Sequence, residues 1–107
     1  MLRFVTDMLR RERFPKAYYE LLFTPCFEKG GVRRTFGWDM TAPASYSNFY
    51  LHTGFSSRAI VHHGWTGPVI AVDPELDFAG VVLGGQIAGK AKTADARVRL
   101  LQLMIRD

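Results

Sequence analysis

The chain has 107 residues and is 48% hydrophobic, which suits a single domain with one modest core. Its formal net charge of +4 comes from basic residues scattered along the chain, a pattern that favours a solvated surface over a patch that follows nucleic acid. No apolar run reaches the roughly 18 residues needed to cross a bilayer.

Cys26 is the single cysteine, so the chain cannot form an intrachain disulfide, and its fold does not depend on an oxidising compartment. Its neighbours Phe23, Pro25 and Phe27 are apolar. We therefore expect Cys26 to be a small buried side chain and not a reactive thiol.

The first 25 residues predict two helices. Apolar residues recur at helical spacing over the first dozen residues, which predicts an amphipathic helix that ends before Pro15. The residues on its apolar side are Met1, Leu2, Phe4, Val5, Met8 and Leu9. A second short helix fits Lys16 to Phe23 and ends at Thr24-Pro25, and its inward residues are expected to be Tyr18, Leu21 and Leu22. The segment from Met1 to Pro15 is too charged for the core of a signal peptide.

The middle of the chain predicts a turn, a strand and a long loop. Lys29-Gly30-Gly31 is the turn, and Val32 to Trp38 has the aromatic and β-branched content of a strand interrupted at Gly37. From Asp39 to Phe55 the chain has no clear periodicity, so we expect a loop there.

Three strands and a helix follow. The strands are expected at Ala59 to His63, Pro68 to Val72 and Phe78 to Leu83. Asp73-Pro74-Glu75-Leu76-Asp77 suits a type I turn with proline at its second position, so the last two strands should form an antiparallel hairpin. A final helix is expected from Thr93 to Arg106, with the inward stripe Ala94, Val98, Leu101, Met104 and Ile105.

These elements predict an α+β fold in a single domain of residues 1–107. Its architecture would be an antiparallel β-meander with N-terminal helices and a C-terminal helix packed on the sheet.

Several motifs resemble the end of a serine hydrolase of the β-lactamase and penicillin-binding protein family. The resemblance lies in Val61-His62-His63-Gly64-Trp65-Thr66-Gly67 before a strand, in the Asp73-Pro74-Glu75 turn, and in the valine-rich strand of residues 78–83. In addition, Phe36-Gly37-Trp38-Asp39-Met40 resembles the Gly-Trp-Asp segment that precedes this strand in class C-like and esterase-like members. Together these motifs cover most of the chain.

The resemblance implies a partial β-lactamase or transpeptidase-like fold. Family members run to several hundred residues with the nucleophile near their beginning, so we expect the chain to be the C-terminal part of a larger enzyme. The complete enzyme would acylate a serine with a β-lactam, an ester or a D-amino-acid peptide and then hydrolyse the product. Members are often exported, but the sequence does not indicate a compartment, and the resemblance implies no cofactor.

The same resemblance assigns roles to four residues. His62 would help to hold the substrate's carboxylate or to polarise the surroundings of the nucleophile, and Gly64 would let substrate approach the backbone. The N–H of Trp65 would form half of an oxyanion hole. His63 stands where the family usually has a Thr or Ser hydroxyl, a departure that affects carboxylate recognition. Because side chains alternate along a strand, His62 and His63 should point to opposite faces.

The nucleophile of the family is absent from the chain. It lies in Ser-x-x-Lys, and none of the serines has a lysine three residues later: Ser45, Ser47, Ser56 and Ser57. No catalytic residue is therefore assigned. Tyr46-Ser47-Asn48 matches the family's Tyr-x-Asn motif but comes too late in the chain. His52-Thr53-Gly54-Phe55 is a second match to the His-x-Gly pattern, and it lacks the Thr-Gly, strand and turn that follow His62.

Other functions remain open. His52, His62 and His63 suggest zinc, but adjacent strand histidines diverge and Cys26 is far away in the sequence, so we expect no metal site. Gly84-Gly85 matches no phosphate-binding loop and replaces an Asn-Arg pair often seen in the family.

A non-catalytic scaffold could instead bind a ligand or partner through the aromatic residues Trp38, Tyr46, Phe49, Tyr50 and Trp65. The expected partners are the missing N-terminal portion of the hydrolase or a second copy joined through residues 78–83.

Overall fold

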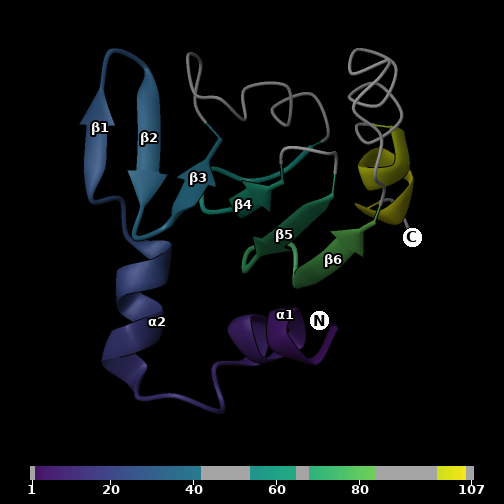
Figure 1. The fold of residues 1–107 in the computed structure, drawn as a ribbon, viewed down its shortest axis with the longest axis horizontal. Helices are drawn as coiled ribbons and strands as arrows, with labels where there is room; N and C mark the ends of the chain where they lie inside the picture. Colours follow the sequence, from purple (N-terminus) through teal and green to yellow (C-terminus); the bar gives the residue numbers. More distant parts are fainter. Residues whose placement is uncertain (1, 42–53, 65–67, 84–98, 106–107) are drawn as a thin grey trace.

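Six strands form one antiparallel sheet, in the order in which they occur in the chain (Figure 1). The computed structural model describes residues 2–41, 54–64, 68–83 and 99–105. The strands are β1 (Phe27–Lys29), β2 (Val32–Thr35), β3 (Trp38–Met40), β4 (Ile60–His63), β5 (Val69–Asp73) and β6 (Phe78–Val82). Each strand pairs antiparallel with the next one. The predicted α+β class and the antiparallel meander are therefore confirmed.

The sheet begins earlier in the chain than the sequence predicts. Strand β1 was not expected, and it forms a hairpin with β2 through Gly30 and Gly31, whose φ angles are 60° and 79°. The predicted strand from Val32 to Trp38 is divided by a turn at Gly37, where φ is 85°. Glycine adopts such angles without the steric cost that other residues incur.

The predicted loop from Asp39 to Phe55 also begins later than expected. Asp39 and Met40 belong to β3, where they pair with Val61 and Ile60 of β4. Both residues are buried, so pairing with β4 and burial of Met40 in the core outweigh the irregular local sequence. Most of the remainder of that predicted loop, residues 42–53, lies outside the described residues.

Two helices cover one face of the sheet: α1 (Leu2–Arg10) and α2 (Lys16–Phe23). Helix α1 packs on β5 and β6, and α2 contacts β2. The buried residues of this layer are Val5, Met8, Tyr19, Leu22, Phe23, Met40, Ile60 and Val72.

The buried residues of both helices differ from those predicted. In α1, Val5 and Met8 are buried, whereas Leu2 and Phe4 are exposed. In α2, Tyr19, Leu22 and Phe23 face the core, and the expected inward residues Tyr18 and Leu21 are exposed. The buried residues of α2 have the same helical spacing as the predicted ones, but each lies one residue later in the chain.

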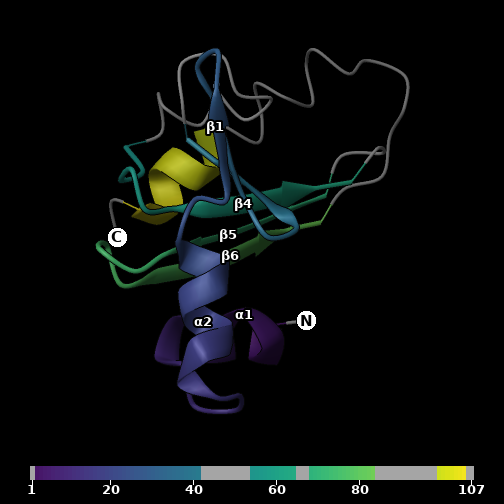
Figure 2. The same ribbon diagram turned by 90° about the vertical axis from the view of Figure 1, so that its left-hand side faces the viewer.

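A C-terminal helical segment covers the opposite face of the sheet. Residues 99–105 are helical, and Figure 2 shows them on the other side of the strands from α1 and α2. The buried residues of this second layer are Phe55, Ala59, Val61, Val69, Ala71 and Leu101. Leu101 and Ile105 face inward as predicted, but Met104 is 37% exposed. Ala94 and Val98, the other residues of the predicted stripe, lie outside the described residues.

A buried tyrosine holds the connection between α1 and α2. The Tyr19 hydroxyl donates to Asp7 Oδ2 at 2.7 Å and accepts from the N–H groups of Arg13 and Phe14 at 3.0 and 2.9 Å. Burial raises the pKa of the Tyr19 hydroxyl, and its hydrogen bond to Asp7 raises the pKa further.

Helix α1 ends before the predicted dozen residues because the chain turns at Arg11, where φ is 59°. The Arg11 N–H donates to the Asp7 carbonyl at 2.6 Å, which closes the last turn of the helix. The Arg13 N–H then donates to Asp7 Oδ1 at 2.7 Å, so one carboxylate organises the whole connection.

Cys26 is exposed, so its predicted burial is wrong. It lies between α2 and β1, and all three residues of β1 are also exposed. The apolar neighbours of Cys26 in sequence therefore do not build a core around it, because β1 forms the outer edge of the sheet.

Candidate functional site

His62 and His63 point to opposite faces of β4, as strand alternation predicts. His62 pairs in register with Ile70, which packs against the layer under α1 and α2. His63 pairs with Val69, which is buried in the layer under the C-terminal helical segment. His62 is exposed and His63 is half-buried, so only His62 offers its imidazole freely to solvent.

His62 belongs to a row of three aromatic rings that come from separate elements. The rings of His62 and of Trp38 on β3 meet in a T-shaped arrangement, with ring centroids 5.8 Å apart and an interplanar angle of 74°. On α1, Phe4 is stacked with Trp38 at 6.5 Å and 13°. We call Phe4, Trp38 and His62 the aromatic row. Such a row offers apolar ring faces and one imidazole, which can accept or donate a hydrogen bond.

Gly64 directly follows β4 and is hydrogen-bonded to the residue that precedes β5. Its N–H donates to the Pro68 carbonyl at 2.9 Å, which closes the connection between the two strands. A Cβ at Gly64 would lie 3.0 Å from Pro68 Cγ, so a larger residue would press on the proline ring. Trp65, to which the resemblance assigns an oxyanion N–H, lies outside the described residues, as do Thr66 and Gly67.

Ser56 has a structural role in the described part of the chain. Its hydroxyl donates to Asp73 Oδ1 at 2.6 Å and accepts from the Arg58 N–H at 3.2 Å. Ser57 is exposed. The other serines, Ser45 and Ser47, lie outside the described residues, as do Tyr46-Ser47-Asn48 and the alternative motif residue His52.

Asp73 is the acceptor that holds this end of the sheet together. Its carboxylate is fully buried and accepts from the Ser56 N–H at 2.7 Å and from the Ser56 hydroxyl. It also accepts from the N–H groups of Glu75 and Leu76 at 3.0 and 3.3 Å. The carboxylate therefore ties the segment before β4 to the turn after β5.

Sequence reasoning recognised Asp73 only as part of a turn. Aspartate before proline often accepts N–H groups two or three residues later, and that signal identifies its contacts within the turn. No local signal identifies Ser56 as its partner, since 17 residues separate the two. The place of Phe4 in the aromatic row was also missed, because its ring partner Trp38 is distant in sequence.

The described residues contain no group of three or more His, Cys, Asp and Glu placed to hold a metal ion. Among the described helices, none combines the length and apolar character that a membrane span requires. A hollow of about 500 Å³ lies along α1 and is lined by none of the four residues to which the resemblance assigns a role.

We compared the chain with family models, curated proteins and solved structures, and none of them matches it.

Proposed function

We propose that the chain is the C-terminal portion of a β-lactamase-related serine hydrolase, in which β4 supplies one wall of the active site. The observation that carries the proposal is the exposed imidazole of His62 on β4, beside Trp38 of the Gly-Trp-Asp segment on β3. Two motifs that the resemblance identifies separately in the sequence thus come together on one face of the sheet.

The strand order supports this proposal. The resemblance requires that the His-x-Gly strand be followed by two strands joined through the Asp-Pro-Glu turn, and β4, β5 and β6 pair antiparallel in that order. The N–H of Gly64 donates to the Pro68 carbonyl, which links the residue after β4 to the residue before β5. A substrate could approach the backbone at Gly64 because this residue has no side chain.

The proposal gives His62 and His63 different roles. His62 would contact the substrate or the surroundings of the nucleophile, because its side chain is exposed on the Trp38 side of β4. His63 faces the other layer and would not enter the same cleft. Trp65 would contribute its N–H to the tetrahedral intermediate, and the nucleophilic serine would come from another part of the complete enzyme.

The first test is the activity of the chain by itself. We expect no turnover of nitrocefin or of p-nitrophenyl esters, because the chain has no Ser-x-x-Lys nucleophile. Stoichiometric acylation by a fluorescent penicillin or a fluorophosphonate that disappears when one serine is changed would contradict this expectation.

The second test uses a longer protein. An adjoining upstream reading frame should encode Ser-x-x-Lys, and the protein translated from both parts should hydrolyse nitrocefin or an ester. In that protein His62→Ala should lower turnover by about 10²-fold or more, and His63→Ala should lower it much less. Equal losses, or a larger loss for His63→Ala, would mean that the assigned facing of β4 is wrong. If no such reading frame exists, the hydrolase proposal fails.

A non-catalytic scaffold that binds a ligand or partner is the second candidate. The observation that favours it is the aromatic row, in which Phe4 is 41% exposed and His62 is exposed. A scaffold would bind through these rings without turnover. If the chain binds a ligand or partner without any turnover, and Trp38→Ala abolishes that binding, the result supports the scaffold over the hydrolase.

A further inference from the structure

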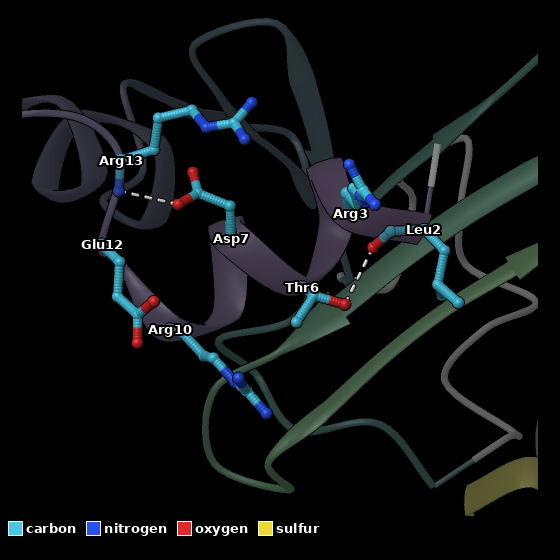
Figure 3. A pocket seen from close by; sticks show the side chains of 7 residues that line it. All are labelled: Leu2, Arg3, Thr6, Asp7, Arg10, Glu12 and Arg13. Carbon is cyan, nitrogen blue, oxygen red and sulfur yellow. Dashed lines mark hydrogen bonds between the residues drawn. The ribbon is translucent and has the colours of Figure 1, made fainter.

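The outer side of α1 carries arginines that are separate in sequence but lie around one hollow. Its volume is about 500 Å³, within the range of pockets that hold small molecules. The lining residues are Leu2, Arg3, Thr6, Asp7, Arg10, Glu12 and Arg13, which Figure 3 shows along α1 and the turn that follows it. We call this depression the α1 hollow.

The arginines reach the hollow for two different reasons. Arg3 and Arg10 are seven residues apart, so they lie on one side of the helix, about 10 Å apart along its axis. That side is opposite the buried residues Val5 and Met8. Arg13 lies beyond the helix end, and the hydrogen bond from its N–H to Asp7 holds it beside the hollow.

Among the described residues, Arg3, Arg10 and Arg13 form no salt bridge. Asp7 also lines the hollow, and its two oxygens accept hydrogen bonds from groups other than the guanidinium groups. Oδ1 accepts from the Arg13 N–H and Oδ2 from the Tyr19 hydroxyl, each at 2.7 Å. The other carboxylate that lines the hollow, Glu12, is exposed. It lowers the positive charge of the hollow, but it forms no salt bridge with Arg3, Arg10 or Arg13.

We propose that the α1 hollow binds a small anion that carries two or more phosphate groups. Guanidinium groups match the oxygen geometry of phosphate and bind it through paired hydrogen bonds. Two arginines separated by two turns of helix suit an anion with charge at both ends better than a single phosphate. This binding site is separate from the residues of the proposed hydrolase cleft, so its test does not depend on that proposal.

The test measures binding of inorganic pyrophosphate and inorganic phosphate to the whole chain by isothermal titration calorimetry at an ionic strength of about 0.1 M, where exposed charges more than about 10 Å from the ligand are largely screened. Pyrophosphate should bind more tightly than phosphate. The triple variant Arg3→Gln, Arg10→Gln, Arg13→Gln should bind pyrophosphate at least about tenfold more weakly. A matched control, Lys29→Gln, Arg58→Gln, Arg99→Gln, removes the same charge from exposed positions outside the hollow and should change the affinity by less than about twofold.

A second variant keeps the proposal testable if the triple variant does not fold, which circular dichroism would reveal. Glu12→Gln removes an exposed carboxylate from the hollow and should strengthen pyrophosphate binding by about two- to threefold. Absence of pyrophosphate binding, equal weakening in the two triple variants, or no gain in Glu12→Gln would overturn the proposal. Binding of a DNA duplex or of phosphatidylserine vesicles without any binding of pyrophosphate would also overturn it, since the ligand would then be a macromolecular surface.

Discussion

The hydroxyl of Ser56 lies 2.6 Å from a carboxylate oxygen of Asp73, and this contact joins two segments that are 17 residues apart. Asp73 is buried and receives four hydrogen bonds, from Ser56, Glu75 and Leu76. The motif that resembles a family signature at the turn after β5 therefore has a structural function of its own. Its aspartate fixes the chain before β4 as well as the turn.

Asp73→Ala should lower the free energy of unfolding by about 2 to 4 kcal/mol, because it leaves buried donors without an acceptor. Urea denaturation followed by circular dichroism measures the change. Ser56→Ala removes the hydroxyl but keeps the Ser56 N–H bond to Asp73, so it should cost only about 1 kcal/mol. Equal losses in the two variants would mean that Asp73 acts through the Ser56 hydroxyl alone.

Tyr19 should make the stability of the chain depend on alkaline pH. Burial and the hydrogen bond to Asp7 raise its pKa above the ordinary value of 10.0, so the folded state holds the phenol proton more tightly than the unfolded state does. The resulting stabilisation is fully present below pH 10.0 and is lost as the pH rises through the folded-state pKa. Thermal unfolding midpoints measured from about pH 8 upwards should therefore fall more steeply in the wild type than in Tyr19→Phe.

Tyr18 provides the matched control for this prediction, because it is the neighbouring tyrosine on the same helix and is exposed. Tyr18→Phe should retain the alkaline loss of the wild type. An alkaline loss that is unchanged in Tyr19→Phe would show that another group is responsible.

Gly80 should be intolerant of alanine because a side chain there would collide with the ring of Phe78. A Cβ at Gly80 would lie 2.6 Å from Phe78 Cζ and 3.0 Å from Met104 Cε. The methionine end can move, but the phenyl ring packs in the second core layer, so we expect Gly80→Ala to cost about 1 to 3 kcal/mol. Urea denaturation again measures the change.

Phe78→Leu separates this steric explanation from a general effect of the substitution. If the ring causes the strain, Gly80→Ala should be less costly in the Phe78→Leu background than in the wild type. Additive losses in the double variant would contradict the steric explanation.

The later strands could be predicted from the sequence because their hydrophobic pattern and turns are local. Strand β4 begins one residue after the predicted start, and β6 ends one residue before the predicted end. The Asp-Pro-Glu turn marks the hairpin that joins β5 and β6. In these strands the local pattern predicts each end to within one residue.

The remaining features depend on contacts between distant residues. Strand β1 has the sequence Phe-Glu-Lys and is fully exposed, so it has no buried face to reveal it. The spacing of α2 is compatible with either Tyr18 or Tyr19 facing inward, and the hydrogen bond between Tyr19 and Asp7 of α1 decides the choice. The candidate site also depends in part on distant contacts. The alternation of His62 and His63 is a local property of the strand, whereas the contact of His62 with Trp38 requires the pairing of β3 with β4.

The edge of β6 should promote self-association. Among the described residues β6 pairs only with β5, and residues 78–83 contain neither charge nor proline to discourage a further strand. Antiparallel pairing of two copies centred on Gly80 would keep Phe78 and Val82, which both pack in the second core layer, on the same face of the joined sheet. Sedimentation velocity at several protein concentrations should therefore show a species larger than the monomer.

Leu83→Lys should reduce this association. Leu83 is 75% exposed next to the end of β6, so lysine there adds a charge at the edge and should change the free energy of unfolding by less than about 0.5 kcal/mol. Leu21→Lys is the control, because Leu21 is 61% exposed on α2, away from this edge, and its replacement should leave association unchanged. A wild-type chain that stays monomeric at every concentration and melts in one sharp transition would mean that the edge is already covered, and would favour the scaffold over the hydrolase portion.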